Sequence, residues 1–469
     1  YRNALLDGTP LVRDVRLRAV PDAPTQEKWI TLLTAGAGNS GQFYYALNVT
    51  DPLAVANDPT GLTEGQPHWL WELADPQTLG YTVGRPAAGH LLLSEQGTVT
   101  EIAAVFLPGG KSSGVGNAGR SLYVVTAAPD PAVAGSPRIL RLFGPGATAT
   151  SDALTYPLVG TPVAYGTLPG QPTSRVFVGD AGGRLLRLDT SATDPSKWTL
   201  RMFYDPYAGQ AESLRRPAFF EPSLSLNTVG DLVVIYGTGD PDNPYDNRGN
   251  HKLISLTETY SLTPGGTVQV TSGERPNFVL TFQTGEQLTG PPLIYDSTVY
   301  FPTYRHDGTN ACKLGETRLW GVDYLGNDLL ATTDIVRRFP TNTTSQLRGS
   351  GDGLWEESSP PSCDEDTGQL GSYAKEVLYC RMPAGTRIYG IEISRSPACE
   401  EYFDDSLLGD GTGGGLSPPV LTVQTGRYLP YGVLGLALQG RTNATKLRRL
   451  LNQPRVSTMP LMWGVIYDD

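Results

Sequence analysis

The stretch RVFVGDAGGRLLRLDTS, residues 175–191, reads as two β-strands joined by a tight turn. The apolar run Val176–Val178 leads into Gly-Asp, and a second apolar run begins at Leu185, after Gly182 and Gly183. Glycine supplies the positive φ angles that a hairpin turn needs, and the flanking alternation of apolar residues supplies its strands. The stretch therefore predicts an antiparallel β-hairpin.

The hairpin pattern recurs along the chain. Comparable strands, each followed by a turn, lie at 42–52, 251–258, 318–328 and 386–394. A second repeat consists of a small residue, one or two prolines and an apolar strand, and it places prolines at Pro10, Pro86, Pro162, Pro217, Pro292 and Pro419. The last gap is about twice the earlier ones, so we expect one further copy, without its proline, near residues 353–359. A proline fits the start of an innermost strand, where its missing N–H costs no ladder bond.

These repeats predict the fold class. Seven units of roughly 55–75 residues, each with about four strands, are typical of an all-β, seven-bladed β-propeller with long insertions between strands. We expect a single domain over residues 1–469, with blades that start near residues 7, 83, 159, 215, 289, 353 and 416. Trp463–Tyr467 is expected to be a strand of the last blade that closes the ring beside the first.

Charge and hydropathy exclude several classes of partner. The net charge is −11, which argues against binding to nucleic acid or to an anionic membrane through bulk electrostatics. No apolar run approaches the length of a membrane span. The chain begins Tyr1-Arg2-Asn3, without Met or a signal peptide, so we expect it to be part of a longer protein.

An ordered set of motifs resembles a known family. AGAGNSGQFYYALNVTDP (35–52), HWLWEL (68–73), the hairpin at 175–191 with DPSKW (194–198) behind it, and VVIYGTGD (233–240) occur in that order. The set resembles the C-terminal domain of the PilY family, the tip-associated biogenesis factors and adhesins of bacterial type IV pili, which is a quinoprotein-like propeller. The resemblance extends over essentially the whole chain.

The resemblance implies a function, a location and partners. It implies a non-enzymatic protein at the cell surface and pilus tip, exported through the periplasm and outer membrane, that supports pilus assembly, adhesion and twitching motility. The implied partners are minor pilins and a host or abiotic surface ligand. It also implies an N-terminal partner-binding or von Willebrand A-like region ahead of these residues.

Two other functions use the same fold. An outer-membrane or periplasmic assembly scaffold would use the propeller as a docking platform, but it leaves the long insertions unexplained, whereas long loops on a rigid scaffold favour binding. A quinone-dependent dehydrogenase would need a set of convergent cofactor ligands and, commonly, adjacent cysteines. The sequence offers neither, and it contains no H-E-x-x-H or P-loop motif. We therefore expect no enzyme activity and no cofactor.

Calcium is the one metal for which the sequence offers a candidate site. Family members often carry an aspartate-rich calcium loop just ahead of the hairpin at 175–191, but residues 163–175 here contain no carboxylate, and Ca²⁺ requires six to eight oxygen ligands. A second acidic loop, residues 239–250, places oxygens at Asp240, Asp242, Asn243 and Asp246. Two interpretations stay open for this loop: a calcium site, or a turn in which Asp and Asn side chains cap their own backbone N–H groups.

The four cysteines all lie in the last third of the chain. They are Cys312, Cys363, Cys380 and Cys399, with no spacing typical of a zinc site. In an exported chain they suggest two disulfides, the alternative being four buried free thiols. Expected strand directions favour Cys363–Cys399 within the sixth unit and Cys312–Cys380 between neighbouring units. The pairing Cys363–Cys380 would join opposite ends of a strand.

Overall fold

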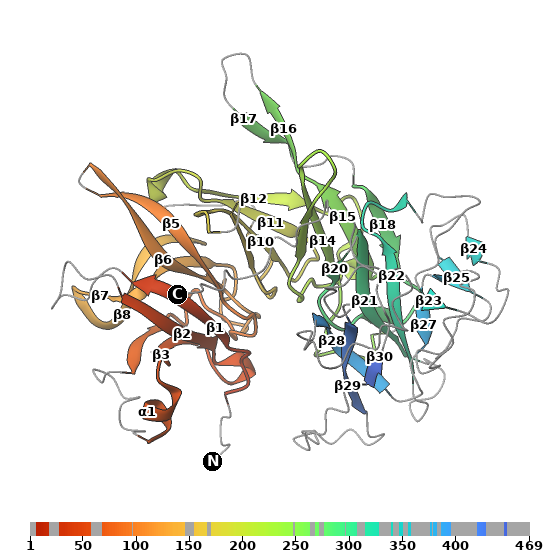
Figure 1. The fold of residues 1–469 in the computed structure, drawn as a ribbon, viewed down its shortest axis with the longest axis horizontal. Coiled ribbons are helices and arrows are strands. Elements are labelled where there is room, and N and C mark those ends of the chain that lie inside the picture. The colour runs from red at the N-terminus through yellow and green to blue at the C-terminus, as the bar shows by residue number, and fades with distance from the viewer. Residues whose placement is uncertain are drawn as a thin grey trace, which may run out of the picture.

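The computed structural model describes the strands of an all-β protein (Figure 1). It describes residues 6–17, 28–57, 68–95, 97–145, 154–166, 170–246, 249–262, 268–271, 276–295, 297–306, 315–327, 339–340, 347–349, 355–357, 376–377, 379–381, 386–394, 420–427 and 445–447. Among them, the one α-helix is α1 (Pro52–Asn57), and single 3₁₀ turns lie at Gly38–Ser40, Pro195–Lys197 and Glu212–Leu214.

Four antiparallel sheets of four strands follow one another along the chain, and each runs up and down in strand order. The first sheet holds β1 (Leu11–Leu17), β2 (Lys28–Gly36), β3 (Phe43–Asn48) and β4 (Trp69–Ala74). The second holds β5 (Ala87–Glu95), β6 (Thr98–Pro108), β7 (Leu122–Asp130) and β8 (Val133–Phe143). The third holds β9 (Val163–Gly166), β10 (Thr173–Gly179), β11 (Leu185–Asp189) and β12 (Thr199–Tyr204). The fourth holds β13 (Ser223–Leu226), β14 (Leu232–Gly237), β15 (Lys252–Thr257) and β18 (Phe278–Thr281).

The described residues also form two further sheets and three small two-stranded pairs. The fifth sheet holds β19 (Glu286–Leu288), β20 (Leu293–Tyr295), β21 (Thr298–Arg305), β22 (Glu316–Asp323) and β27 (Tyr379–Arg381). The sixth holds β28 (Thr386–Ser394), β29 (Val420–Arg427) and β30 (Thr445–Leu447). The small pairs are β16 (Thr259–Leu262) with β17 (Val268–Thr271), β23 (Phe339–Pro340) with β26 (Glu376–Val377), and β24 (Leu347–Gly349) with β25 (Trp355–Glu357).

The hairpin predicted at residues 175–191 is confirmed. β10 and β11 pair antiparallel, with Gly179 opposite Leu185 beside the turn. The buried carboxylate of Asp180 closes that turn, because its Oδ1 accepts the backbone N–H groups of Gly182 and Arg184, each at 2.9 Å. Gly183 has a φ of +79°, and a Cβ there would lie 2.3 Å from the carbonyl oxygen of Arg216. Backbone conformation and close packing thus both require this glycine.

The proline repeat marks strand starts. β1, β5, β9, β20 and β29 each begin one residue after a proline of the repeat, at Pro10, Pro86, Pro162, Pro292 and Pro419. In the fourth sheet the residue before the strand is Pro222, not Pro217. β29 lies between β28 and β30, so a proline also precedes a central strand. The ladder pairs of β29 begin at Val420, so the proline takes part in none of them.

The last third of the chain divides differently from the expected blades. β27 pairs with β22 of the fifth sheet, although we expected residues 374–380 to belong to a sixth unit that starts near residue 353. β28 and β29 share one sheet, although a blade was expected to start near residue 416. Hydrogen bonding of β27 to the free edge of β22 explains the first difference, since an open edge leaves N–H and C=O groups without partners. Trp463–Tyr467 lies outside the described residues.

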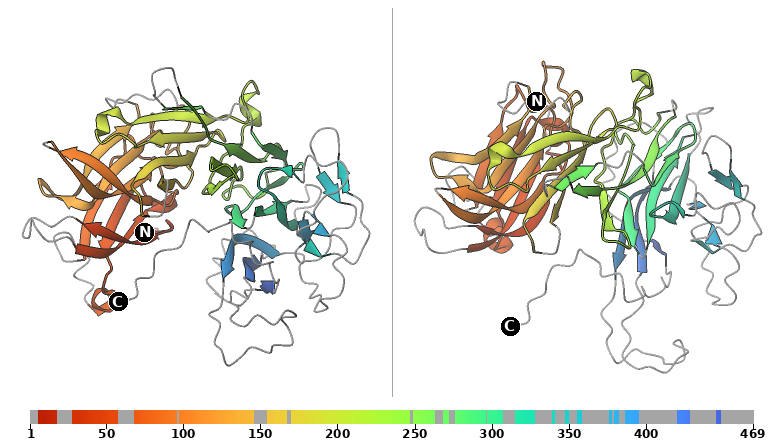
Figure 2. Two further views of the ribbon diagram at one scale, coloured as in Figure 1. Left: turned by 45° about the horizontal axis from the view of Figure 1, so that its top comes forward. Right: turned by 90° about the horizontal axis from the view of Figure 1, so that it is seen from above.

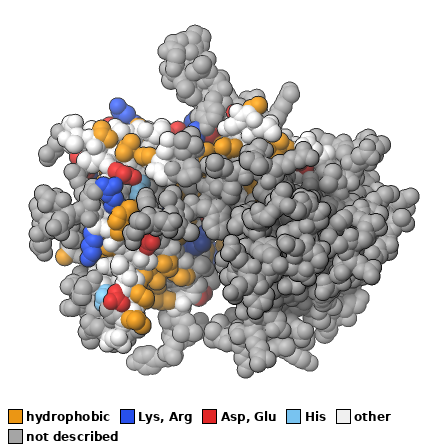
Figure 3. Space-filling model, in the orientation of Figure 1, with side chains coloured by type: hydrophobic (Ala, Val, Ile, Leu, Met, Phe, Trp, Pro, Cys, Tyr) orange, Lys and Arg blue, Asp and Glu red, His pale blue; other side chains and the backbone are white. Residues whose placement is uncertain are grey.

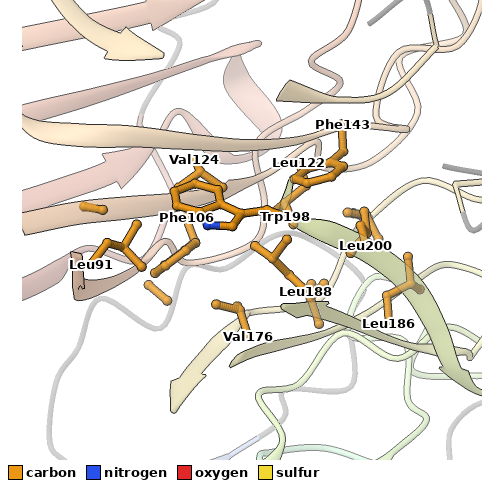
Figure 4. Close-up of a cluster of buried hydrophobic side chains, with 14 of the residues drawn as sticks. Leu91, Phe106, Leu122, Val124, Phe143, Val176, Leu186, Leu188, Trp198 and Leu200 are labelled. Carbon is orange, nitrogen blue, oxygen red and sulfur yellow. The ribbon is translucent and has the colours of Figure 1, made fainter. Parts of the chain in front are cut away.

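Each hydrophobic core lies between two successive sheets. Figure 4 shows the core between the second and third sheets, where Phe106, Leu122 and Phe143 meet Leu188 and Trp198. Similar cores join the first sheet to the second, the third to the fourth and the fourth to the fifth. Figures 1 and 2 show the sheets side by side in chain order along an arc. The cores therefore act as joints between neighbouring sheets.

A buried ionic cluster reinforces the joint between the third and fourth sheets. Glu258 follows β15, and its fully buried carboxylate lies 2.7 Å from the Nε of Arg187 and 2.9 Å from the Nε of Arg175. Arg187 is in β11 and Arg175 in β10, so one carboxylate forms ion pairs with two guanidinium groups of the adjoining sheet. A buried charge is tolerated only with such partners.

The first sheet exposes apolar side chains on its outer face. Its inner face packs on the second sheet through residues such as Val15, Ile30 and Leu32. Val12 and Trp29 are 55% and 60% exposed, and hydrophobic side chains gather over this part of the surface in Figure 3. Among the described residues, no element covers this outer face.

Candidate functional site at the acidic loop

The acidic loop connects β14 to β15 on the fourth sheet, and the structure describes it at residues 238–246 and 249–251. It is the counterpart of the loops 37–42, 109–121 and 180–184, which also join the second and third strands of their sheets. Because successive strands run in opposite directions, these loops all emerge on the same side of the molecule. Loops on one side of a rigid scaffold are where binding sites commonly lie.

The start of the loop is held by a buried amide. The side-chain oxygen of Gln287 accepts the N–H of Asp240 at 2.7 Å, and its nitrogen donates to the carbonyl of Asn243 at 2.9 Å. The Asp240 carboxylate accepts the N–H of Asp242 at 3.0 Å, as in an Asx turn. Burial raises the pKa of Asp240. Gln287 lies in β19, so the fifth sheet sets the shape of this loop.

An ion pair joins the middle of the loop to the second sheet. Asp242 Oδ2 lies 2.6 Å from the Nζ of Lys111, and both side chains are partly exposed. Lys111 is fixed by two backbone hydrogen bonds with Tyr81, of 2.7 and 2.8 Å. A second ion pair, Arg85–Glu221, joins the segments ahead of β5 and β13. Both pairs link segments of the second sheet directly to segments of the fourth.

The end of the loop is buried. Asp246 Oδ2 lies 3.6 Å from the Nε of Arg216 and 3.7 Å from the Nε2 of His251, and all three side chains are buried. Arg216 also donates from Nε to the carbonyl of Gly249 at 2.8 Å. Burial lowers the pKa of His251, which keeps the ring neutral at pH 7. This arrangement anchors the loop rather than leaving Asp246 accessible to solvent.

The loop also reaches the fifth and sixth sheets. The ring of Tyr245 packs edge-on against His306, with centroids 4.8 Å apart. The guanidinium of Arg387 lies 5.9 Å from the Tyr245 ring and 3.8 Å from the ring of Tyr304. One loop therefore contacts residues of the second, fifth and sixth sheets as well as its own.

The four residues predicted as calcium ligands have different surroundings. Asp242 faces Lys111, Asp246 faces Arg216 and His251, and Asp240 and Asn243 contact Gln287. In the part of the chain that the structure describes, no three His, Cys, Asp or Glu residues are placed to hold a metal ion. The capped-turn interpretation describes the hydrogen bond of Asp240, and calcium binding stays a prediction.

Sequence reasoning missed the partners of the loop. All three are distant in sequence: Lys111 lies in the loop between β6 and β7, Gln287 in β19 and Arg387 in β28. No local pattern marks them, because their proximity depends on how the sheets pack.

The cysteine prediction is largely outside the described residues. Cys312, Cys363 and Cys399 are not among them, whereas the backbone of Cys380 lies in β27, opposite Leu319 of β22. The two predicted disulfides stay predictions, and non-reducing peptide mapping would decide between the pairings. Among the described residues, no helix is long and apolar enough to span a membrane.

Comparison with known proteins concerns the fold. No protein-family model matches the chain, and no curated protein sequence matches it significantly. The crystal structure of the Pseudomonas aeruginosa PilY1 C-terminal domain is similar, with a TM-score of 0.50 and 16% identity over 91% of this chain and 84% of that one. BamB from Moraxella catarrhalis matches over 88% of this chain and 95% of its own, at 12% identity and a TM-score of 0.27, too low to indicate a shared fold. The resemblance to the C-terminal domain of the PilY family is therefore confirmed at the level of the fold.

Proposed function

We propose that this chain is the propeller domain of an exported, type IV pilus-associated protein that supports pilus assembly, surface adhesion and twitching motility without catalysing a reaction. The observation that carries the proposal is the fold shared with the PilY1 C-terminal domain over 91% of this chain. A second line of support is the ordered set of motifs at 35–52, 68–73, 175–198 and 233–240. These motifs belong to the sequence and do not depend on the comparison of structures.

The fold in this proposal is a closed ring of seven blades. Its support is the series of four-stranded meanders, joined in chain order by hydrophobic cores. Contacts continue from the fifth sheet to the sixth, where the Thr289 hydroxyl donates to the Ile388 carbonyl at 2.6 Å. Val12 and Trp29 are exposed on the outer face of the first sheet, where the closing blade would pack. Closure would remove this apolar face from water and pair the open edge.

The proposed role is that of a rigid binding platform. The acidic loop is braced by Lys111, Gln287 and Arg387, so its exposed parts are held in a defined arrangement. Binding to minor pilins at the tip and to a surface ligand would use such loops, because preorganised loops lose little entropy on binding. The charged side chains Asp242 and Asp246 face cations of the chain itself, which suits a structural role for the loop better than a catalytic one.

Genetic complementation of the source bacterium tests the function. Cells would carry the full-length protein, or a version that lacks residues 1–469 and keeps everything N-terminal to them. We expect the deletion to reduce surface pili, twitching zones and adhesion, each normalised to the amount of exported protein. Normal piliation, twitching and adhesion in the deletion strain would contradict the proposal.

Point variants separate a binding role of the loop from its fold. Lys111→Ala and Asp242→Ala remove the exposed ion pair, and Lys197→Ala serves as a matched control on another loop. We expect the first two to impair adhesion while the melting temperature changes little, because exposed pairs contribute little to stability.

The dehydrogenase alternative is tested by absorbance spectra of the purified chain with and without added quinone. Binding of quinone together with quinone-dependent turnover would refute the non-enzymatic proposal.

A further inference from the structure

Three turns on the side of the molecule opposite the acidic loop present exposed aliphatic side chains. Connections from a first to a second strand, and from a third to a fourth, emerge on that side, because successive strands run in opposite directions. Leu53 lies between β3 and β4, Val133 follows the turn from β7 to β8, and Val229 lies between β13 and β14. Their exposed fractions are 73%, 52% and 78%. Val229 and Leu53 are the two most exposed large hydrophobic residues in the part of the chain that the structure describes.

The backbone of these turns is held by side-chain caps. Asp51 Oδ1 accepts the N–H of Leu53 at 3.1 Å, and Asn227 Oδ1 accepts the N–H of Val229 at 3.1 Å. Asp130 accepts an N–H at 2.9 Å in the turn that leads into β8. Turns usually carry polar residues at such exposed positions, because apolar groups in contact with water raise the free energy. The chain therefore places aliphatic groups in water on three ordered turns.

The arrangement of the three turns fits a flat partner. They belong to the first, second and fourth sheets, and the sheets lie side by side along an arc (Figure 2). Side chains that project from one side of such a body can meet an extended surface together, whereas a peptide or a small molecule would need them in one groove. Aliphatic groups gain free energy when they leave water for an apolar surface.

The composition of the turns argues against a membrane as that surface. Residues 51–53, 130–133 and 227–231 each contain one Asp and no Lys, Arg, Trp or Tyr. An anionic leaflet repels carboxylates, and proteins that bind at the membrane interface use aromatic and basic side chains as anchors. An uncharged solid surface avoids that repulsion.

We propose that the side of the molecule that carries Leu53, Val133 and Val229 is a contact surface for uncharged, apolar solids. The inference rests on the adhesive role proposed above and names the class of surface ligand. It adds a second contact surface to the acidic loop, on the opposite side of the molecule.

Dissociation of the purified whole chain from a butyl-terminated monolayer, followed by surface plasmon resonance, tests the proposal. The variant combines Leu53→Asn with Val229→Asn. The matched control combines Leu214→Asn with Val115→Asn, at residues that are 41% and 51% exposed in connections on the acidic-loop side. A hydroxyl-terminated monolayer and anionic phospholipid vesicles serve as comparison surfaces, and melting curves check that both variants fold.

We expect the unmodified chain to dissociate at least about tenfold more slowly from the butyl than from the hydroxyl monolayer. The variant should lose most of this difference, because amides replace two aliphatic contacts, and the control should behave as the unmodified chain. Equal dissociation of the variant and the unmodified chain, or an equal loss in the control, would overturn the proposal. Vesicle binding that the variant abolishes would overturn the assignment to a solid surface.

The outcome can be separated from that of the proposed function. The monolayer assay uses no pili, so its failure would leave a role in pilus assembly and twitching standing. Normal piliation, twitching and adhesion in cells that lack residues 1–469 would contradict that role whatever the monolayer shows.

Discussion

Replacing Glu258 by Gln should destabilise the joint between the third and fourth sheets. The carboxylate is fully buried and contacts Arg187 at 2.7 Å and Arg175 at 2.9 Å. Gln keeps the size of the side chain but removes the charge. The side chain of Arg187 is only 2% exposed, so its cation would stay buried without the partner that balances it.

The magnitude follows from that burial. Breaking a buried ion pair by removing one partner costs about 3–5 kcal/mol, because the remaining charge is uncompensated. Arg187 retains a contact of 3.1 Å with Asp189, whose side chain is partly exposed, so we expect a loss of about 3 kcal/mol, at the lower end. With a urea m-value near 3 kcal/mol per M, that loss lowers the unfolding midpoint by about 1 M.

Urea unfolding followed by tryptophan fluorescence provides the assay, and Glu72→Gln on the exposed side of β4 is the matched control. The control should change the stability by less than about 0.5 kcal/mol. Removing both buried partners, as in Glu258→Leu with Arg187→Leu, should recover part of the loss, because apolar replacements avoid the desolvation of charge. A Glu258→Gln variant as stable as the control would refute the reasoning, as would a double variant less stable than the single one.

Three further predictions concern ring closure, calcium and pH. Deleting residues 461–469 should lower the melting temperature markedly or prevent folding, because the apolar outer face of the first sheet would stay exposed; an unchanged melting curve would count against closure. Titration calorimetry with Ca²⁺ should show no tight site, or one weak site that Asp242→Ala abolishes; a tight site that survives this change would place the ligands elsewhere. Burial raises the pKa of Asp75, but hydrogen bonds from Tyr123 (2.7 Å) and Thr78 (2.8 Å) outweigh it, and the pKa is lowered overall. Its contribution to stability is therefore present above the unfolded pKa and is lost as the pH falls through the folded one, so Tyr123→Phe should destabilise more at pH 7 than at about pH 3; equal losses in thermal melts at both pH values would contradict this.

Local features of the fold could be predicted from the sequence because short-range chemistry determines them. The hairpin at 175–191 has its turn glycines and its strands within one stretch, and β10 and β11 form there. The strands after Pro10, Pro86 and Pro162 start one residue later, since proline marks the last position outside the ladder.

Contacts between distant segments could not be predicted in the same way. Lys111 meets Asp242 although 131 residues separate them, and neither neighbourhood carries a signal for the other. β27 was expected in the sixth unit, but it pairs with β22, and no local pattern in the sequence marks that partner. The acidic loop itself was recognised, but two residues that hold it, Lys111 and Gln287, come from distant parts of the chain.

The connection of β27 to the fifth sheet has a consequence for the order of folding. Strands of the first three sheets are consecutive in the chain, so each sheet can form from one emerging segment. The fifth sheet must wait for β27, because residues 324–378 separate it from β22. Closing so long a loop costs entropy before β27 forms its stabilising contacts with β22, and this cost slows assembly. The first three sheets should therefore acquire protection from hydrogen exchange early in refolding, and the fifth should acquire it late.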